Sequence, residues 1–139
     1  MSAVVLDASF TFQWLFKNEA LPESEECLRQ INFGEVLVPA LWHVEITNGV
    51  GMASRRERIT QQELPGVFGL LRTLPIVVDQ PPLQRWRVDI LALMQIHRLT
   101  AYDASYLEIA RRRQTLLATK DQQLAAVAAL EGVRLFALA

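Results

Sequence analysis

The stretch AVVLDAS (residues 3–9) sets the architecture of this chain. Four apolar residues, two of them β-branched, are typical of a buried strand, and the acid and serine near the end of the stretch are typical of a helix start. A helical pattern then covers roughly residues 9–17. A strand that turns at once into a helix is the opening unit of an α/β domain, in which strands and helices alternate.

The same alternation continues to the end of the chain. After the strand at 3–6, short apolar runs predict further strands at 36–38, 76–78, 116–118 and 133–136. Helical spacing predicts further helices at roughly 22–32, 40–57, 60–73, 82–98, 103–113 and 121–130. Strands separated by helices imply right-handed crossovers, so we expect a mostly parallel sheet in a three-layer α/β/α sandwich.

Length and composition predict one globular domain over residues 1–139. Hydrophobic residues make up 51% and charged residues 21%, which excludes the disordered class of proteins. No apolar run approaches the ~20 residues that cross a bilayer, and the N-terminal residues lack the pattern of a signal peptide. The single Cys27 cannot form an internal disulfide. We therefore expect a cytoplasmic protein with no membrane partner.

The net charge of −1 argues against a protein that coats nucleic acid through bulk positive charge. This net charge is compatible with an enzyme that binds a short stretch of RNA through a local group of basic residues. Arginines cluster at 55–58 and at 111–113, where helices are predicted to end. Cations are favoured near a helix C-terminus, so each cluster is either a solvated helix end or part of an RNA contact.

Three aspartates stand where a predicted strand ends or the next helix begins. Asp7 ends the first strand, Asp103 opens a helix, and Asp121 follows the fourth strand. Each has an ordinary structural explanation, because acids at these positions cap helices or oppose their dipoles. For Asp121 this explanation is strongest, since Thr119 and Gln122 match a capping box. Ligands of open parallel sheets, however, bind at the carboxyl ends of strands, so the same positions also predict a binding site.

Glu45 has no such explanation, because it lies inside a predicted helix rather than at its start. Helical spacing places it on the apolar side with Trp42 and Gly49, and Asn48 follows one turn later. An unpaired carboxylate that faces inward is costly, so Glu45 needs a cation, a buried partner or a bound proton. A salt bridge to an arginine is one solution, and a metal ion is another.

Taken together, the four acids predict a cation site. Two carboxylates about 4 Å apart repel by about 4 kcal/mol at an effective dielectric of about 20, so a converging quartet needs compensation. A hard divalent cation supplies it, and oxygen ligands without a His/Cys set favour Mg²⁺ or Mn²⁺ over zinc. Hydrolysis of a nucleic-acid backbone is the reaction that such a site supports most directly.

Four motifs carry a resemblance to a known family: VLDAS (5–9), PALWHVEITN (39–48), YDASYL (102–107) and LATKD (117–121). From residue 4 to about residue 136 the chain resembles the PIN-domain family, and VapC-type toxins in particular. The resemblance implies a parallel α/β/α fold with strand order 3-2-1-4-5 and Mg²⁺- or Mn²⁺-dependent endoribonuclease activity on RNA. It also implies a homodimer and, as in VapBC toxin–antitoxin pairs, a small cognate antitoxin whose C-terminal segment enters the acidic cleft.

Carried over by position, the resemblance assigns metal coordination and catalysis to four acids. These are Asp7, Glu45, Asp103 and Asp121. Three polar residues match supporting positions of the family: Ser9, Asn48 and Thr119. Gln123 stands where some members carry a further acid, so the resemblance covers one metal site more fully than a second. Lys120 is either a phosphate contact or a hydrated surface lysine.

The remaining candidates for chemistry have simpler interpretations. The tryptophans are expected in the core or at a dimer face rather than as base-stacking platforms. Tyr106 is expected to pack against the sheet. His43 and His97 have no acid or nucleophile at a spacing that would make a catalytic pair.

Two alternatives to a ribonuclease stay open. A PIN fold that has lost catalysis would serve as a scaffold or binding module, although an intact quartet of acids favours an enzyme. A phosphotransfer enzyme of the haloacid-dehalogenase type also has an aspartate at the end of its first strand. Such enzymes usually carry a second aspartate two residues later, where this chain has Ser9.

Overall fold

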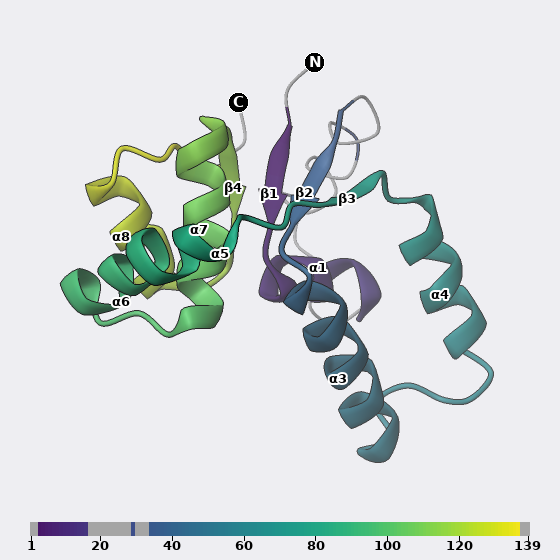
Figure 1. The fold of residues 1–139 in the computed structure, drawn as a ribbon. Coiled ribbons are helices and arrows are strands. Elements are labelled where there is room, and N and C mark those ends of the chain that lie inside the picture. Colours follow the sequence, from purple (N-terminus) through teal and green to yellow (C-terminus); the bar gives the residue numbers. More distant parts are fainter. Residues whose placement is uncertain (1–2, 17–28, 30–33, 137–139) are drawn as a thin grey trace.

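A computed structural model describes residues 3–16, 29 and 34–136. Its sheet has four strands, β1 (Val4–Leu6), β2 (Val36–Val38), β3 (Ile76–Val78) and β4 (Leu116–Ala118). All neighbouring strands are parallel, and their order is β3-β2-β1-β4 (Figure 1). The α/β/α fold predicted from the sequence is confirmed.

The two middle strands form the centre of the core. Every residue of β1 and β2 is buried, because each strand has neighbours on both sides and helices over the sheet. β3 is an edge strand, and its Val77 and Val78 are 40% and 42% exposed. Continuous apolar strands of this kind are expected where a parallel sheet is covered on both faces.

Helices cover both sides of the sheet, α5 to α8 on one side and α1, α3 and α4 on the other (Figure 1). The first group is α5 (Leu83–Arg85), α6 (Leu91–His97), α7 (Ala101–Arg113) and α8 (Gln122–Leu130). The second is α1 (Ala8–Leu15), α3 (Leu41–Arg55) and α4 (Leu64–Thr73). α7 packs along β1, β2 and β4. Within the described ranges, no helix is long and apolar enough to cross a membrane.

Two predicted helices differ from the structure, and a third falls almost wholly outside the described residues. The helix predicted at 60–73 begins at Leu64, because Thr60 and Glu63 form reciprocal side chain–backbone hydrogen bonds in a turn before it. The helix predicted at 82–98 contains a π-helical segment, η2 (Trp86–Ile90), between α5 and α6. The helix predicted at 22–32 lies outside the described residues apart from residue 29.

The fifth predicted strand, at 133–136, is wrong as a regular strand. The structure has a single parallel bridge there, between Leu117 of β4 and Leu135. The Leu117 amide donates to the Arg134 carbonyl, and the Phe136 amide donates to the Leu117 carbonyl. The segment therefore occupies the fifth position of the order 3-2-1-4-5, but it pairs with one residue of β4 only.

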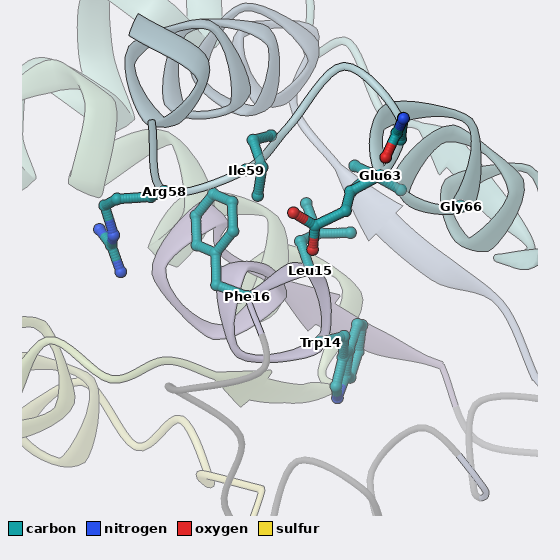
Figure 2. Close-up of a pocket in the computed structure, with 9 residues that line it drawn as sticks. Trp14, Leu15, Phe16, Arg58, Ile59, Glu63 and Gly66 are labelled. Carbon is teal, nitrogen blue, oxygen red and sulfur yellow. The ribbon is translucent and has the colours of Figure 1, made fainter. Parts of the chain in front are cut away.

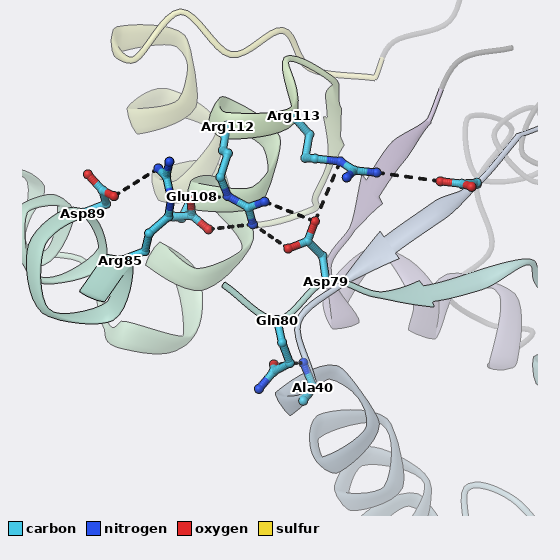
Figure 3. A network of polar contacts seen from close by, with 9 residues as sticks. Ala40, Asp79, Gln80, Arg85, Asp89, Glu108, Arg112 and Arg113 are labelled. Carbon is cyan, nitrogen blue, oxygen red and sulfur yellow. Dashed lines mark hydrogen bonds and ion pairs between the residues drawn. The ribbon is translucent and has the colours of Figure 1, made fainter. Parts of the chain in front are cut away.

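A buried ion network ties α7 to the loop after β3 (Figure 3). The Arg112 guanidinium lies 2.8 Å from a Glu108 oxygen and 2.5 Å from an Asp79 oxygen. The Glu108 and Asp79 side chains are only 3% and 10% exposed. Arg112 thus satisfies two buried acids, which neither interpretation of the 111–113 cluster anticipated. Beside it, the Ala40 amide at the start of α3 donates to the Gln80 side chain, 3.4 Å away.

Candidate metal-binding site at the carboxyl edge of the sheet

Four acids from separate parts of the chain lie at the carboxyl edge of the sheet. Asp7 follows β1, and Asp121 follows the adjacent strand β4 after a short loop. Glu45 is in the second turn of α3, and Asp103 is the third residue of α7. Because neighbouring parallel strands end on the same side, their following loops meet there.

Asp7 is the most constrained of the four, and it is 4% exposed. One carboxylate oxygen accepts from the Ser9 hydroxyl at 2.7 Å and from the Phe10 amide at 2.9 Å. The other oxygen accepts from the Thr119 hydroxyl. Burial raises the pKa of Asp7, and the three hydrogen bonds oppose this rise without cancelling it. Asp7 is thus the N-cap of α1, and it is also a carboxylate whose charged form is disfavoured by its surroundings.

Thr119 and Ser9 join the loops that follow β1 and β4. The Thr119 hydroxyl donates to Asp7 and accepts from the Asp121 amide at 3.0 Å. The Ser9 hydroxyl donates to Asp7 and accepts from the Lys120 amide at 3.1 Å. Each hydroxyl therefore donates to the Asp7 carboxylate and accepts from a backbone amide of the loop after β4. The Lys120 side chain stays exposed.

Glu45 lies at the edge of the buried face of α3 and is half-buried. Its carboxylate accepts a hydrogen bond of 2.7 Å from the Tyr106 hydroxyl on α7. Burial raises the pKa of Glu45, and the charges of Asp7 and Asp103 raise it further. The hydrogen bond from Tyr106 acts in the opposite direction.

Asp103 and Asp121 stand at the starts of two helices. Thr100 is the N-cap of α7, where its hydroxyl accepts from the Asp103 amide at 3.2 Å. Burial raises the pKa of Asp103, and the charge of Asp121 adds to the rise. Asp121 itself caps α8 by accepting from the Leu124 amide at 3.1 Å. The capping-box interpretation of Thr119 is therefore wrong, because its hydroxyl is used on Asp7 and Asp121 instead.

The acids form a chain of mutual repulsion. Asp7 interacts with Glu45 and Asp103, Glu45 interacts with Asp103, and Asp103 interacts with Asp121. Every one of these interactions disfavours the charged carboxylate. A divalent cation reverses this penalty, and a donor set of oxygens alone matches Mg²⁺ or Mn²⁺.

The four acids have the right donor atoms for a divalent cation, but they are not arranged around one point. Among residues 3–16, 29 and 34–136, no three Asp, Glu, His or Cys side chains converge closely enough to hold a metal ion. The donor set therefore matches a divalent cation by its oxygen chemistry, while the carboxylates do not converge on one point in this structure. Carboxylates without a cation between them are expected to stand apart for the reason just given.

The predicted supporting residues divide into two groups. Ser9 and Thr119 both donate to Asp7. Asn48 is exposed one turn beyond Glu45, and its side chain makes no hydrogen bond within the described part of the chain. At 100° per residue, Asn48 is rotated further from the buried face than Glu45 is. Gln123, at the place of a possible further acid, is exposed as well.

Tyr106 is the contact that sequence reasoning missed. It does pack in the core, at 2% exposure, but its hydroxyl reaches an acid 61 residues away in the sequence. A signal was present, because Tyr106 lies three residues after Asp103 and therefore near it on the same helix. His97 similarly pairs with Glu131 at 2.9 Å, a partner that spacing along the chain did not indicate.

A separate cleft of about 600 Å³ lies between the end of α1, the segment after α3 and the start of α4 (Figure 2). Its walls include Trp14, Phe16, Arg58, Ile59 and Glu63. None of the four acids lines it. The four acids and this cleft are thus different places on the molecule.

Comparison with known proteins identifies relatives of the fold. The family model described as PIN domain matches residues 4–130. The chain is also similar to a solved structure, the crystal structure of PAE2754 from Pyrobaculum aerophilum, with a TM-score of 0.66 and 19% sequence identity. That match covers 91% of this chain and 84% of the other. No protein with a curated description matches.

Proposed function

Since this chain belongs to the PIN-domain family, a family generally of nucleases, we propose that it is a metal-dependent endoribonuclease. The observation that carries the proposal is the mutual repulsion of four carboxylates at the carboxyl edge of the sheet. Such an arrangement is destabilising in the metal-free protein, and a functional site is the usual reason for its retention.

The proposed metal ligands are the four acids, and the metal is Mg²⁺ or Mn²⁺. They are Asp7, Glu45, Asp103 and Asp121. A divalent cation bound there stabilises the negative charge that develops on a phosphodiester during hydrolysis. Asn48 is kept as a supporting residue of this proposal, although its exposed side chain is available to substrate rather than to Glu45.

Residues of this chain hold the site in place before substrate arrives. Ser9 and Thr119 fix both oxygens of Asp7 and hold the loops after β1 and β4 together. Their hydroxyl protons are directed at Asp7, so the carboxylate stays oriented when its charge is uncompensated. Lys120 extends from the same loop with an exposed side chain, where it would meet a phosphate of the RNA.

We propose further that the enzyme is the VapC-type toxin of a VapBC pair, that it acts in the cytoplasm as a homodimer, and that a small antitoxin inhibits it. Unmetallated carboxylates attract a fork of donors, so an antitoxin Arg or Lys would enter the acidic edge. The test is a crystal structure of the toxin with its antitoxin. An acidic edge left empty while the antitoxin binds elsewhere contradicts this mode of inhibition.

The principal competitor is an inactive PIN scaffold. The haloacid-dehalogenase alternative is set aside, because the family match covers residues 4–130. In addition, the position of the second aspartate of such enzymes is held by Ser9, which donates a hydrogen bond to Asp7. An inactive scaffold would fold and bind partners without needing Mn²⁺. A ribonuclease and an inactive scaffold therefore differ in whether they bind metal and whether they cleave RNA.

The decisive experiment measures RNA cleavage by the purified protein with Mn²⁺ and with EDTA. Asp7→Asn and Asp103→Asn should each lower the rate by roughly 100-fold or more, since metal ligands matter at least as much as the partners that support them. Asp89→Asn is the matched control, because Asp89 pairs with Arg85 on the surface, away from the four acids. Equal cleavage by wild type and both site variants would exclude hydrolysis at this site.

Metal binding gives an independent test. Mn²⁺ should raise the midpoint of thermal unfolding of the wild-type protein, and EDTA should reverse the rise, because a ligand bound only by the folded state stabilises it. Asp103→Asn should lose most of this effect, whereas Asp89→Asn should keep it. A folded wild-type protein with no affinity for Mn²⁺ or Mg²⁺ contradicts the metal-dependent nuclease.

A further inference from the structure

Tyr106 is a buried phenol at the junction of α3 and α7. Its side chain is fully enclosed, with 2% of the residue exposed, and its hydroxyl lies 2.7 Å from one carboxylate oxygen of Glu45. Buried aromatic residues often serve only to fill space. Here the polar end of the ring is directed at an acid of the proposed site.

The position of Tyr106 on α7 explains why it reaches that acid. Asp103 and Tyr106 are three residues apart, so they differ by about 60° around the helix and by one turn along it. The same helix face therefore carries one proposed ligand, Asp103, and the hydrogen-bond donor to another, Glu45. A shift of α7 would move both groups together.

The phenol can act only as a donor toward Glu45. The Tyr106 hydroxyl has one proton to donate, and the Glu45 oxygen 2.7 Å away is a carboxylate acceptor, so the contact runs from Tyr106 to Glu45. The direction of this hydrogen bond follows from the chemistry of the two groups and the distance between them.

We propose that Tyr106 is a positioning residue, whose hydroxyl holds one oxygen of Glu45 and turns the other toward the metal. This inference rests on the proposed metal site and adds a role that the four acids alone do not provide. Glu45 is the acid most in need of such help, because it is on a helix interior and has no capping interaction to orient it. Partners that orient a ligand in this way typically change metal affinity by 10–100-fold.

The first test is Mn²⁺ affinity measured by calorimetry on the full chain. Tyr106→Phe removes one oxygen from the ring and should raise the Kd for Mn²⁺ by about 10-fold. Tyr102→Phe makes the same chemical change on the same helix, at a side chain that is 63% exposed, and should leave the Kd unchanged. A Tyr106→Phe variant that binds Mn²⁺ like the wild type overturns the inference.

A double-mutant cycle separates positioning from a general effect on folding. In a Glu45→Ala background, Tyr106→Phe should have no further effect on the Kd, because the group that it orients is absent. An equal loss of affinity with and without Glu45 would mean that Tyr106 acts through the packing of α7, and the inference would be wrong. Wild-type protein that binds no Mn²⁺ would instead overturn the proposed function, and the inference with it.

A measurement on the intact chain covers the case in which Tyr106→Phe does not fold. The chain contains only two tyrosines, so protein labelled with 3-fluorotyrosine gives two fluorine signals, and Tyr102→Phe assigns them. Saturating Mg²⁺ should move the Tyr106 signal, and Glu45→Ala should abolish the movement. A Tyr106 signal that stays in place when Mg²⁺ binds contradicts the inference.

Discussion

Replacing Arg112 with methionine should cost this protein about 3 kcal/mol of unfolding free energy. The change keeps a long, unbranched side chain and removes the guanidinium that neutralises Glu108 and Asp79. Breaking a buried ion pair by removing one partner typically costs about 3–5 kcal/mol, because the other charge is left uncompensated. The lower end applies because the Arg112 side chain is 21% exposed and Arg113 stays 3.7 Å from Asp79.

Urea unfolding at neutral pH measures this loss. With a slope of about 1–3 kcal/mol per molar urea, the midpoint should fall by roughly 1–3 M. Arg85→Met is the matched control, because Arg85 pairs with Asp89 at a surface position where the two side chains are 46% and 35% exposed. That pair should contribute no more than about 1 kcal/mol. Equal losses for the two variants would refute the claim that the Arg112 network is a buried one.

Three further outcomes follow from the site and its packing. The three site acids with a raised pKa contribute stability that is present below their unfolded-state pKa values and is lost as the pH rises through the folded-state values. The stability of metal-free Asp103→Asn relative to wild type, measured by urea unfolding, should therefore increase from pH 4 to pH 7; a constant difference contradicts the raised pKa. Thr119→Val should cost about 1–3 kcal/mol in the same assay, because the Asp7 carboxylate and the Asp121 amide both lose a buried partner; a neutral effect would exclude a structural role for that hydroxyl. Gly49→Val should lower the thermal unfolding midpoint, since a Cβ at Gly49 would lie 2.2 Å from the Phe12 ring. Gly51→Val, on the open side of α3, should leave the midpoint unchanged or slightly higher, because valine is a better helix former than glycine. Equal midpoints for the two variants would mean that the Phe12 ring moves aside freely.

The strands were predictable from the sequence because their signal is local. Short apolar runs at 36–38, 76–78 and 116–118 coincide with β2, β3 and β4, and the first two are rich in β-branched residues. The strand at 133–136 was predicted from the same kind of run, and it failed because a strand also needs a partner along its length. Pairing is a property of the sheet, so apolar composition alone cannot guarantee it.

The candidate site was predictable as a set of positions. Aspartates after β1 and β4 and at the start of α7 were expected at one edge, because strand ends of a parallel sheet open on the same side. The sequence predicted that acids or hydroxyls would cap these helices, but it did not predict which side chain would cap which helix. Thr119 was expected to cap α8, and Asp121 caps it instead, since the Thr119 hydroxyl has a stronger acceptor in the Asp7 carboxylate.

Sequence by itself determined the alternation of strands and helices and the acids that stand at their ends, because both depend on residues close together in the chain. Tertiary structure alone decided which side chains meet. Glu45 finds Tyr106 across 61 residues, and Arg112 finds Asp79 across 33. Such contacts depend on how α3, α7 and the sheet pack, and no spacing along the chain encodes that packing. The acids were therefore visible in the sequence, whereas the groups that orient and neutralise them became visible only in the folded chain.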